Sequence, residues 1–545
     1  MKEYSFDSDN CNARINRSIK FQNEVMKTQV LIIGSGVTGT GLARDLALRG
    51  VGCILIDKGD FNAGASGGNH GLLHSGARYV VSDPASAAEC QHENRLLKEL
   101  APQCVEDTGG LFVARAGDDE RYVADFPGLC KAHGIPIESV PISDALELEP
   151  SLTHKLIAAF SVNDASIDPF KLSIDNISDA VRHGATFLPY QAATGFIKDN
   201  NRLVRVHVVD SLSGKKMTIE ADQVVNACGA WAGHTASLAM EGSALKMVYA
   251  KGTLLVTQTR IAQRVINRLR NPTDGDILVP GGTVSILGTT SVRVQSPDHF
   301  RPTVEEVDHI IAEGADMLPM LEHTRYIRAY AGIRPLIESS PTADDRSVSR
   351  GYALIDHTDA GVENFVTITG GKLTTFRLMA EKASNLICSR LGIDTPGRTR
   401  TEPLPASSNG KWTEPGRAPR HWFQHCPPDD ILLCECEMIP KSVVDNIVGA
   451  IRNQHGTPSL VAIGKRSRMG KGPCQGAFCG PRVTAYLYDQ GIFEARQGIN
   501  DLKHFLSARW RGQKPLMWGT PLVQAELQEA MQCGLLGLEL EPDEQ

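Results

Sequence analysis

The chain has 545 residues, which is too long for a single hydrophobic core, so we expect roughly two to four domains. Apolar residues make up 41% of it and charged residues 22%, the proportions of soluble globular proteins, which excludes a largely disordered or fibrous chain. The formal net charge of −7 argues against a nucleic-acid binder, because neutralising phosphates requires a basic surface.

Residues 1–27 predict a polar N-terminal extension without the apolar segment of a signal peptide. No run of about 18 or more apolar residues follows, so we expect no segment to span a bilayer and a cytoplasmic location. Cys53 and Cys228 lie inside apolar, strand-like runs, where free thiols in a reducing compartment are buried as small hydrophobic groups.

A βαβ unit is predicted over residues 29–60, "QVLIIGSGVTGTGLARDLALRGVGCILIDKGD". Its glycines allow a tight turn, a close approach of backbone N–H groups to a pyrophosphate, and close helix packing, and an acidic residue ends the second strand where it can bind ribose hydroxyls. The pattern predicts a dinucleotide site but does not separate FAD from NAD. The residues expected there are Gly34, Ser35, Gly36, Gly39, Asp57 and Lys58.

Further along, helices are expected at 88–100 and 168–183, and strands at 202–210, 223–231, 252–257 and 285–294. A helix in 301–318 should begin with a capping box, because Thr303 and Glu306 have the required spacing. This order predicts a nucleotide-binding fold interrupted by a second lobe. Residues 398–430, rich in Pro, Ser and Gly, predict a linker, followed by a cysteine-bearing module at 431–482 and a tail at 483–545.

The loop at 59–80, "GDFNAGASGGNHGLLHSGARYV", is a long run of small and polar residues. It resembles the stretch along the isoalloxazine ring in the glucose-oxidase-like and D-amino-acid-oxidase-like flavoproteins, which favours FAD; an ordinary glycine-rich surface loop is the alternative. The resemblance implies cofactor contacts for Ser66, Asn69, His70 and Gly71.

With this loop, four stretches resemble motifs of the FAD-dependent glycerol-3-phosphate dehydrogenases: "HSGARY" (74–79), "YAGIRPL" (330–336), "SVSRGY" (347–352) and "ITGGKLTTFR" (368–377). The resemblance covers about residues 28–395, and the cysteine module makes the whole chain similar to the large catalytic subunits of the anaerobic members. It implies an α/β fold: a Rossmann-like FAD domain (28–397) interleaved with a β-rich, D-amino-acid-oxidase-like substrate domain (about 246–345), plus a small helical iron–sulfur module.

The resemblance also implies roles for single residues. Arg334 and Arg350 match the positions that hold the substrate phosphate, for which planar, permanently charged guanidinium groups are suited, and Arg78 and Tyr79 match the same pocket. The alternative for each arginine is a solvated charge or a structural ion pair. The remaining matches near the flavin are Gly229, Gly370, Gly371, Lys372, Leu373 and Thr374.

Oxidation of a secondary alcohol requires a base for the hydroxyl proton. Histidine suits this role, because its ordinary pKa is about 6.5. His74 is the first candidate because it matches the family's histidine, and His70 in the same loop is the second. A structural role is the alternative for either residue.

Four cysteines near the C-terminus form a C-x-C pair, Cys434 and Cys436, and a C-x4-C pair, Cys474 and Cys479, separated by 37 residues. Four thiolates can hold zinc or an iron–sulfur cluster. The spacing resembles the [2Fe-2S] domain related to bacterioferritin-associated ferredoxin; zinc, or free thiols, are the alternatives. The basic residues in the same loop are expected to offset cluster charge, to dock an acidic partner or to be solvated: Lys465, Arg466, Arg468 and Lys471.

The resemblance therefore implies oxidation of sn-glycerol 3-phosphate to dihydroxyacetone phosphate in anaerobic respiration. Electrons would pass through partner subunits of B and C type, with FMN possible in one of them, to membrane quinone, and the chain would be peripheral on the cytoplasmic face of the inner membrane through those subunits. Two alternatives stay open. One is a flavin dehydrogenase of a 2-hydroxy acid or amino acid, because "NHGLLHSG" (69–76) also resembles the L-2-hydroxyglutarate dehydrogenase loop, and the other is a non-enzymatic electron-transfer or scaffold protein.

Overall fold

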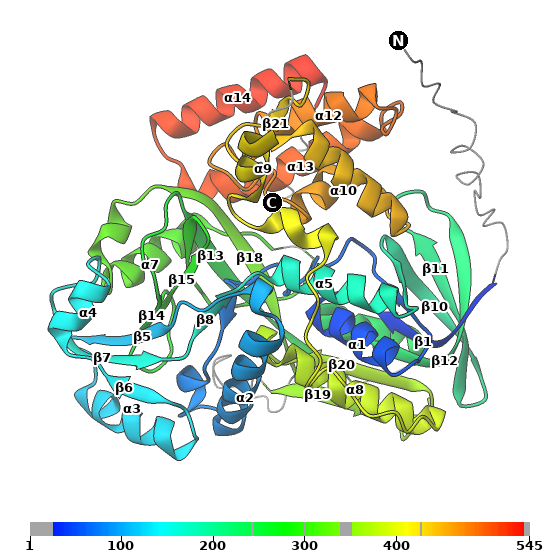
Figure 1. Cartoon of the computed structure of the whole chain (residues 1–545), viewed down its shortest axis with the longest axis horizontal. Coiled ribbons are helices and arrows are strands. Elements are labelled where there is room, and N and C mark those ends of the chain that lie inside the picture. The colour runs from blue at the N-terminus through cyan, green and yellow to red at the C-terminus, as the bar shows by residue number, and fades with distance from the viewer. Residues whose placement is uncertain (1–24, 241–244, 299, 338–350, 426–427, 539–545) are drawn as a thin grey trace, which may run out of the picture.

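The computed structural model describes residues 25–240, 245–298, 300–337, 351–425 and 428–538 (Figure 1). Arg350, a predicted phosphate ligand, lies outside the described residues. The structure contains two large sheets and a C-terminal group of helices, α9 to α14, that lies across the top of Figure 1.

The predicted βαβ unit is confirmed as β1 (Val25–Ile33), α1 (Val37–Leu48) and β2 (Cys53–Ile56). Gly34 has φ of +107°, and a Cβ there would lie 2.5 Å from the carbonyl oxygen of Ala227. The turn between strand and helix therefore requires glycine for both its backbone conformation and its space.

The first sheet has eight strands in the order β10-β11-β12-β1-β2-β9, with β20 beside β12 and β19 beside β20. The strands of its centre are parallel, and Ile33 of β1 pairs with Asn226 of β12, so the chain segments that follow these two strands emerge at the same edge. The other strands are β9 (Thr186–Leu188), β10 (Gln191–Asp199), β11 (Arg202–Asp210), β12 (Lys216–Asn226), β19 (Tyr352–Asp356) and β20 (Phe365–Gly370).

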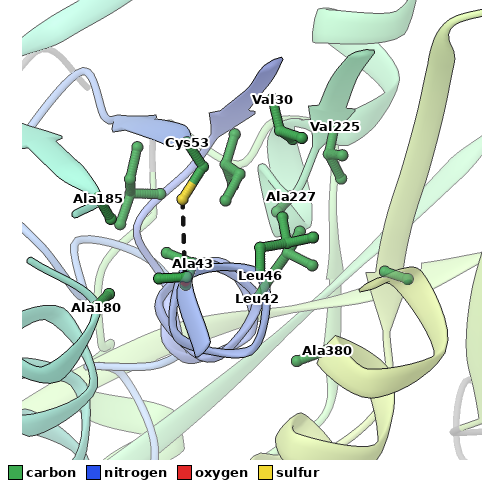
Figure 2. Close-up of a cluster of buried hydrophobic side chains, with 14 of the residues drawn as sticks. Val30, Leu42, Ala43, Leu46, Cys53, Ala180, Ala185, Val225, Ala227 and Ala380 are labelled. Carbon is green, nitrogen blue, oxygen red and sulfur yellow. Dashed lines mark hydrogen bonds between the residues drawn. The ribbon is translucent and has the colours of Figure 1, made fainter. Parts of the chain in front are cut away.

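One face of this sheet is covered by α1, α5 (Pro169–Arg182) and α8 (Phe376–Leu391). Figure 2 shows part of the core between them, where the Cys53 thiol donates to the carbonyl oxygen of Ala43 at 3.7 Å. Burial raises the pKa of Cys53 to about 12, which confirms the predicted inert, buried thiol. On the opposite face, α6 (Ala232–Ala239) packs against the sheet.

The second sheet has nine strands in the order β17-β13-β16-β15-β14-β5-β7-β6, with β18 also paired to β13. The predicted lobe, 246–345, contains only part of this sheet, because β14 pairs in parallel with β5 from an earlier segment. The strands are β5 (Gly110–Arg115), β6 (Ile137–Ser139), β7 (Leu156–Val162), β13 (Met247–Thr257), β14 (Val265–Arg268), β15 (Ile277–Gly281), β16 (Val284–Gly288), β17 (Val292–Val294) and β18 (Tyr326–Ile337).

Helix α7 (Val304–Ala315) packs on this sheet and begins with the predicted capping box of Thr303 and Glu306. Smaller elements connect the two sheets. These are β3 (Leu72–Leu73), β4 (Val105–Glu106), β8 (Ala165–Ile167), α2 (Pro84–Leu100), α3 (Glu120–Ala132), α4 (Ile142–Leu148), and the short helices η1 (Ala77–Tyr79), η2 (Pro102–Cys104), η3 (Gly229–Trp231), η4 (Pro319–Glu322) and η5 (Leu373–Thr375).

The C-terminal part, which we call the cysteine unit (residues 408–538), has one buried core that extends from Trp412 to Leu538. The segment expected to be a linker, 398–430, thus contributes helices and the buried Trp412 to this core. The module at 431–482 and the tail at 483–545, expected as separate regions, both contribute residues to the same core. Its elements are η6 (Ser408–Thr413), α9 (Arg417–His425), β21 (Leu432–Cys434), β22 (Ile439–Pro440), α10 (Lys441–Asn453), α11 (Leu460–Lys465), α12 (Cys479–Asp489), α13 (Gln497–Gln513), η7 (Lys514–Leu516) and α14 (Thr520–Leu536).

Within the ranges that the structure describes, no helix combines the length and the apolar character needed to cross a membrane.

Candidate active site

A cavity of about 820 Å³ lies between the two sheets, at the edge where β1 and β12 end. It brings together most of the predicted site residues: Gly34, Gly36, Asp57, Lys58, Ser66, Asn69, His70, His74, Arg78, Tyr79, Gly229, Arg334, Gly370, Gly371, Lys372 and Leu373. Four other predicted residues do not line it but contact residues that do: Ser35, Gly39, Gly71 and Thr374.

At one end of the cavity, Asp57 is held in place by local hydrogen bonds. Its Oδ2 accepts from the backbone N–H of Ser35 at 2.7 Å and from the Ser35 hydroxyl at 2.9 Å, and its Oδ1 accepts from Gly59 N–H at 2.9 Å. Burial raises the pKa of Asp57, and these hydrogen bonds counteract that effect. Oδ1, which accepts only one of these hydrogen bonds, retains a further lone pair, which suits acceptance from a ribose hydroxyl.

The N-terminus of α1 faces the same cavity through Gly36 and Val37. The first turn of this helix carries no acidic residue, so its partial positive charge is available to an anion such as a pyrophosphate. The Ser66 hydroxyl accepts from Val37 N–H at 2.9 Å, which fixes the flavin-type loop against the helix start.

Farther along the cavity, His74, Tyr79 and Lys372 form a compact polar group. The Tyr79 hydroxyl lies 3.2 Å from Nε2 of His74, and the Lys372 ammonium lies 4.5 Å from the centre of the Tyr79 ring. His74 is buried, and its backbone N–H donates to the Thr374 hydroxyl at 3.0 Å. The ring of His70 lies 6.2 Å from that of His74, so both candidate bases face one region.

Two of the three arginines predicted for the substrate pocket, Arg78 and Arg334, also reach this region. Arg78 is buried, with Nη2 paired to Asp276 at 3.0 Å, while Nη1 is buried without a hydrogen-bond partner among the described residues. An arginine N–H left unsatisfied at a cavity is costly unless an anion or water occupies the space, so the geometry suits an anionic group.

Arg334 is oriented by the second sheet. Its Nη1 donates to the Thr290 carbonyl at 3.1 Å and its Nη2 to the Thr289 hydroxyl. A Cβ at Gly252 would lie 2.6 Å from Arg334 Nη2, so glycine there leaves room for the guanidinium. Asp276 positions Arg78, and Thr289 positions Arg334. Neither residue was predicted, because no motif marks it and each is distant in sequence from the arginine that it contacts.

The four cysteines meet as the spacing predicted. Sγ of Cys436 lies 3.8 Å from that of Cys434 and 3.7 Å from that of Cys474, and Cys479 contacts the thiols of Cys434 and Cys474. A Cβ at Gly472 would lie 2.5 Å from Cys436 Sγ. In the described part of the chain, no group of three or more His, Cys, Asp or Glu side chains is already arranged to hold a metal ion.

Hydrogen bonds between the thiols, together with burial, raise the pKa of Cys434, Cys436 and Cys479 above its ordinary value. Backbone N–H groups of Glu437, Gly470, Gly476 and Phe478 donate to the sulfurs. Hydrogen bonds from Cys436 and Cys479, and from two of these N–H groups, hold the pKa of Cys474 well below its ordinary value. Four thiols with N–H donors are the donor set of an iron–sulfur cluster, so the residues fit such a group.

The basic residues of the cysteine loop are committed to contacts within the chain, which corrects the expectation of solvated or partner-docking charges. Arg466 is buried and paired with Asp60 of the FAD domain, and Lys465 donates to the carbonyl oxygens of Asp60 and Phe61. Arg468 pairs with Glu437 inside the cysteine unit, and Lys471 lies 5.0 Å from the ring of Phe170 in α5.

A second contact connects the cysteine unit with the cavity through β18. The Tyr330 hydroxyl donates to the carbonyl oxygen of Asn69, a cavity residue, at 2.7 Å. One residue before Tyr330 on β18, the Ala329 carbonyl lies so close to Gly512 of α13 that a Cβ at Gly512 would be 2.6 Å from it. The same helix places Phe505 against Gly476, within the C-x4-C loop.

The fold and the cavity together define a flavin-dependent oxidoreductase. The family model described as FAD dependent oxidoreductase (DAO) matches residues 29–384, and the chain belongs to this family. It is 40% identical over 536 residues to the A subunit of the anaerobic glycerol-3-phosphate dehydrogenase of Escherichia coli K12, covering 94% of this chain and 98% of that protein. The A1 subunit of the Haloferax volcanii enzyme of the same name is 37% identical over 94% of this chain and 91% of its own length.

Solved structures agree with the α/β flavoprotein fold predicted from the sequence. The glycerol-3-phosphate dehydrogenase from Bacillus halodurans complexed with FAD has a TM-score of 0.61 at 20% identity, covering 90% of this chain and 96% of that one. The L-proline dehydrogenase from P. horikoshii has a TM-score of 0.57 at 21% identity, covering 73% of this chain and 99% of that one. At these identities, the likeness concerns the fold.

Proposed function

We propose that the chain is the catalytic component of an FAD-dependent glycerol-3-phosphate dehydrogenase, which oxidises sn-glycerol 3-phosphate to dihydroxyacetone phosphate. The observation that carries the substrate assignment is the buried Nη1 of Arg78, without a partner among the described residues, in the cavity that also holds His74 and Tyr79. Similarity to glycerol-3-phosphate dehydrogenase subunits over 94% of the chain favours a phosphate over a carboxylate at this arginine.

Residues at the edge of the first sheet would hold FAD: Asp57 would accept from the ribose, and the start of α1 would face the pyrophosphate. When bound, FAD supplies the acceptor for a hydride. Arg78 and Arg334, with Arg350 as the third predicted ligand, bind the phosphate and so place the substrate's secondary alcohol beside His74. His74 takes the hydroxyl proton as the C–H bond breaks and its electron pair leaves as hydride, which converts the alcohol to a ketone.

Tyr79 and Lys372 position this base. The Tyr79 hydroxyl lies 3.2 Å from Nε2 of His74, and the Lys372 ammonium lies over the Tyr79 ring. Tyr79 therefore orients the imidazole of His74, and Lys372 packs against Tyr79.

The four cysteines are proposed to hold a [2Fe-2S] cluster, which when bound supplies a one-electron carrier. The two electrons released by each alcohol then leave the chain for partner subunits, which reduce quinone. The relatives are named as the A and A1 subunits of their enzymes, which supports a multi-subunit enzyme, and attachment to the membrane through those partners follows from it.

Anaerobic stopped-flow of the FAD-loaded chain tests the substrate assignment. Glycerol 3-phosphate should bleach the flavin within the turnover time, whereas D-lactate and glycine at equal concentration should not. Bleaching by either of those two and not by glycerol 3-phosphate would reject it in favour of a hydroxy-acid or amino-acid dehydrogenase.

The metal assignment is tested on the same protein by measuring iron, acid-labile sulfide and zinc. Two irons and two sulfides per chain are expected for a [2Fe-2S] cluster. Cys436→Ser should then leave substrate-driven bleaching intact and abolish quinone reduction by the assembled complex. Stoichiometric zinc without sulfide would show that the cysteines serve structure instead.

A further inference from the structure

Helix α14 carries apolar residues on the side that faces the core and on the side that faces outward, with Gln and Glu residues between them. Its inner side, including Cys533 and Leu536, packs against the core of the cysteine unit. Its outer side exposes four large apolar residues at every fourth position, which we call the outer stripe: Val523 (63% exposed), Leu527 (60%), Met531 (55%) and Leu535 (81%).

The outer stripe is unusual for this chain. No other helix among the described residues carries more than two exposed large hydrophobic side chains, and scattered single exposures need no explanation. Trp518, 84% exposed, lies two residues before the helix. A contiguous apolar surface of this kind marks an interaction site.

This helix is tied to the cysteine centre. Nε2 of Gln532 donates to the carbonyl oxygen of Ala477 at 3.0 Å, inside the loop between Cys474 and Cys479. The next residue of that loop, Phe478, is 62% exposed, and the thiol-bearing Cys436 is also exposed. Helix α14, at the top of Figure 1, therefore contacts the loop that carries Cys474 and Cys479.

The charge of the helix distinguishes between kinds of occupant. α14 contains no Lys or Arg and carries Glu526 and Glu529. Helices that lie on anionic membranes combine an apolar face with cationic residues, so this composition does not fit a lipid surface. It fits the apolar face of another protein.

We propose that the outer stripe, together with Phe478, is the docking surface for the redox-active partner protein that takes electrons from this chain. The proposal rests on the proposed function, in which electrons must leave through another subunit. Docking here would cover the apolar helix and bring the partner's own electron acceptor to the exposed side of the cysteine centre. The active-site cavity, lined by other elements, stays open to substrate.

Site-specific photo-crosslinking in the assembled enzyme tests the surface. A benzophenone amino acid replaces Leu527 in this chain, which also carries an affinity tag. The complex is purified from its source organism through that tag. The matched control carries the benzophenone amino acid in place of Leu212, which is 56% exposed between β11 and β12. We expect Leu527 to crosslink to a stoichiometric subunit that carries its own redox cofactor, and Leu212 not to.

The double variant Leu527→Glu/Met531→Glu gives a second readout. Since central apolar contacts dominate interface stability, we expect the partner protein to be lost and glycerol 3-phosphate-driven quinone reduction to fall by about tenfold or more. Dye reduction should be unchanged, and Leu212→Glu should change neither activity.

Three outcomes would overturn the proposal: a crosslink between two copies of this chain, flotation of the isolated chain with anionic vesicles that the double variant abolishes, or unaltered quinone reduction in the double variant. These outcomes can be told apart from a failure of the proposed function. If the proposed function is wrong, glycerol 3-phosphate will not reduce the flavin of the wild-type protein, and the crosslinking result can still be interpreted.

Discussion

A buried ion pair joins the cysteine unit to the FAD domain. Arg466, with a side chain only 2% exposed, contacts the equally buried Asp60 through two bonds, Nη1 to Oδ2 at 2.5 Å and Nη2 to Oδ1 at 3.1 Å. Asp60 lies three residues beyond Asp57, so the contact adjoins the segment proposed to bind ribose. We expect Arg466→Met to loosen this junction.

The expected loss of stability follows from the buried carboxylate of Asp60, which remains after Arg466→Met. Burial raises the pKa of Asp60, but the charges of Arg466 and Lys465 outweigh burial and lower it overall. Without Arg466, the carboxylate stays buried with Lys465 as its remaining cation. Breaking a buried pair costs about 3–5 kcal/mol, and the remaining lysine places the expected loss near the lower end, at about 3 kcal/mol.

Urea unfolding of the FAD-loaded chain, followed by tryptophan fluorescence and by flavin release, measures this loss. Trp412, 5% exposed in the core of the cysteine unit, reports on that unit. Because a multidomain chain need not unfold in one step, the transition of each probe is analysed separately. Arg205→Met, which removes a surface pair with Glu220, is the matched control and should leave both midpoints unchanged.

The double substitution Asp60→Leu/Arg466→Met separates loss of contact from the cost of a lone buried charge. Replacing both partners of a buried pair by apolar residues is often nearly neutral, so we expect it to recover most of the lost stability. The reasoning is refuted if Arg466→Met matches the Arg205→Met control, or if the double variant is less stable than the single one.

Three other substitutions address the active site and the pH dependence. Arg78→Met should raise the apparent constant for glycerol 3-phosphate by about tenfold to a hundredfold with flavin content retained, since charge-assisted hydrogen bonds contribute roughly 1.5–3 kcal/mol; unchanged kinetics would contradict phosphate binding there. His74→Gln should slow flavin reduction and flatten its pH profile below about pH 7, and an unaltered profile would transfer the base role to His70. Burial raises the pKa of Asp501 from 3.8 to about 6. Between these two pH values the folded state binds more protons than the unfolded state, so the free energy of unfolding falls as the pH rises from about 4 to about 6. Asp501→Asn should remove this slope in urea titrations at about pH 4 and about pH 6.5, and a slope equal to wild type would disprove the assignment.

Local sequence patterns were sufficient to predict helices, turns and caps whose stabilising contacts lie within a short stretch of the chain. The βαβ unit, the turn at Gly34 and the capping box at Thr303 are found where they were predicted. Short spacings also confine each cysteine pair, and the flavin-loop residues from Ser66 to Tyr79, to one loop each. That the two cysteine pairs meet was expected from the family resemblance and not from their spacing.

Tertiary structure alone decided the contacts that join distant segments. The pairing of β14 with β5 extends the second sheet beyond the predicted lobe, Asp276 orients Arg78, and Asp60 takes up the charge of Arg466. The outer stripe of α14 consists of large apolar side chains, and only the fold shows that these side chains are exposed. Burial and charge pairing depend on which surfaces meet in three dimensions, and a local pattern specifies the face of an element without specifying what will cover it.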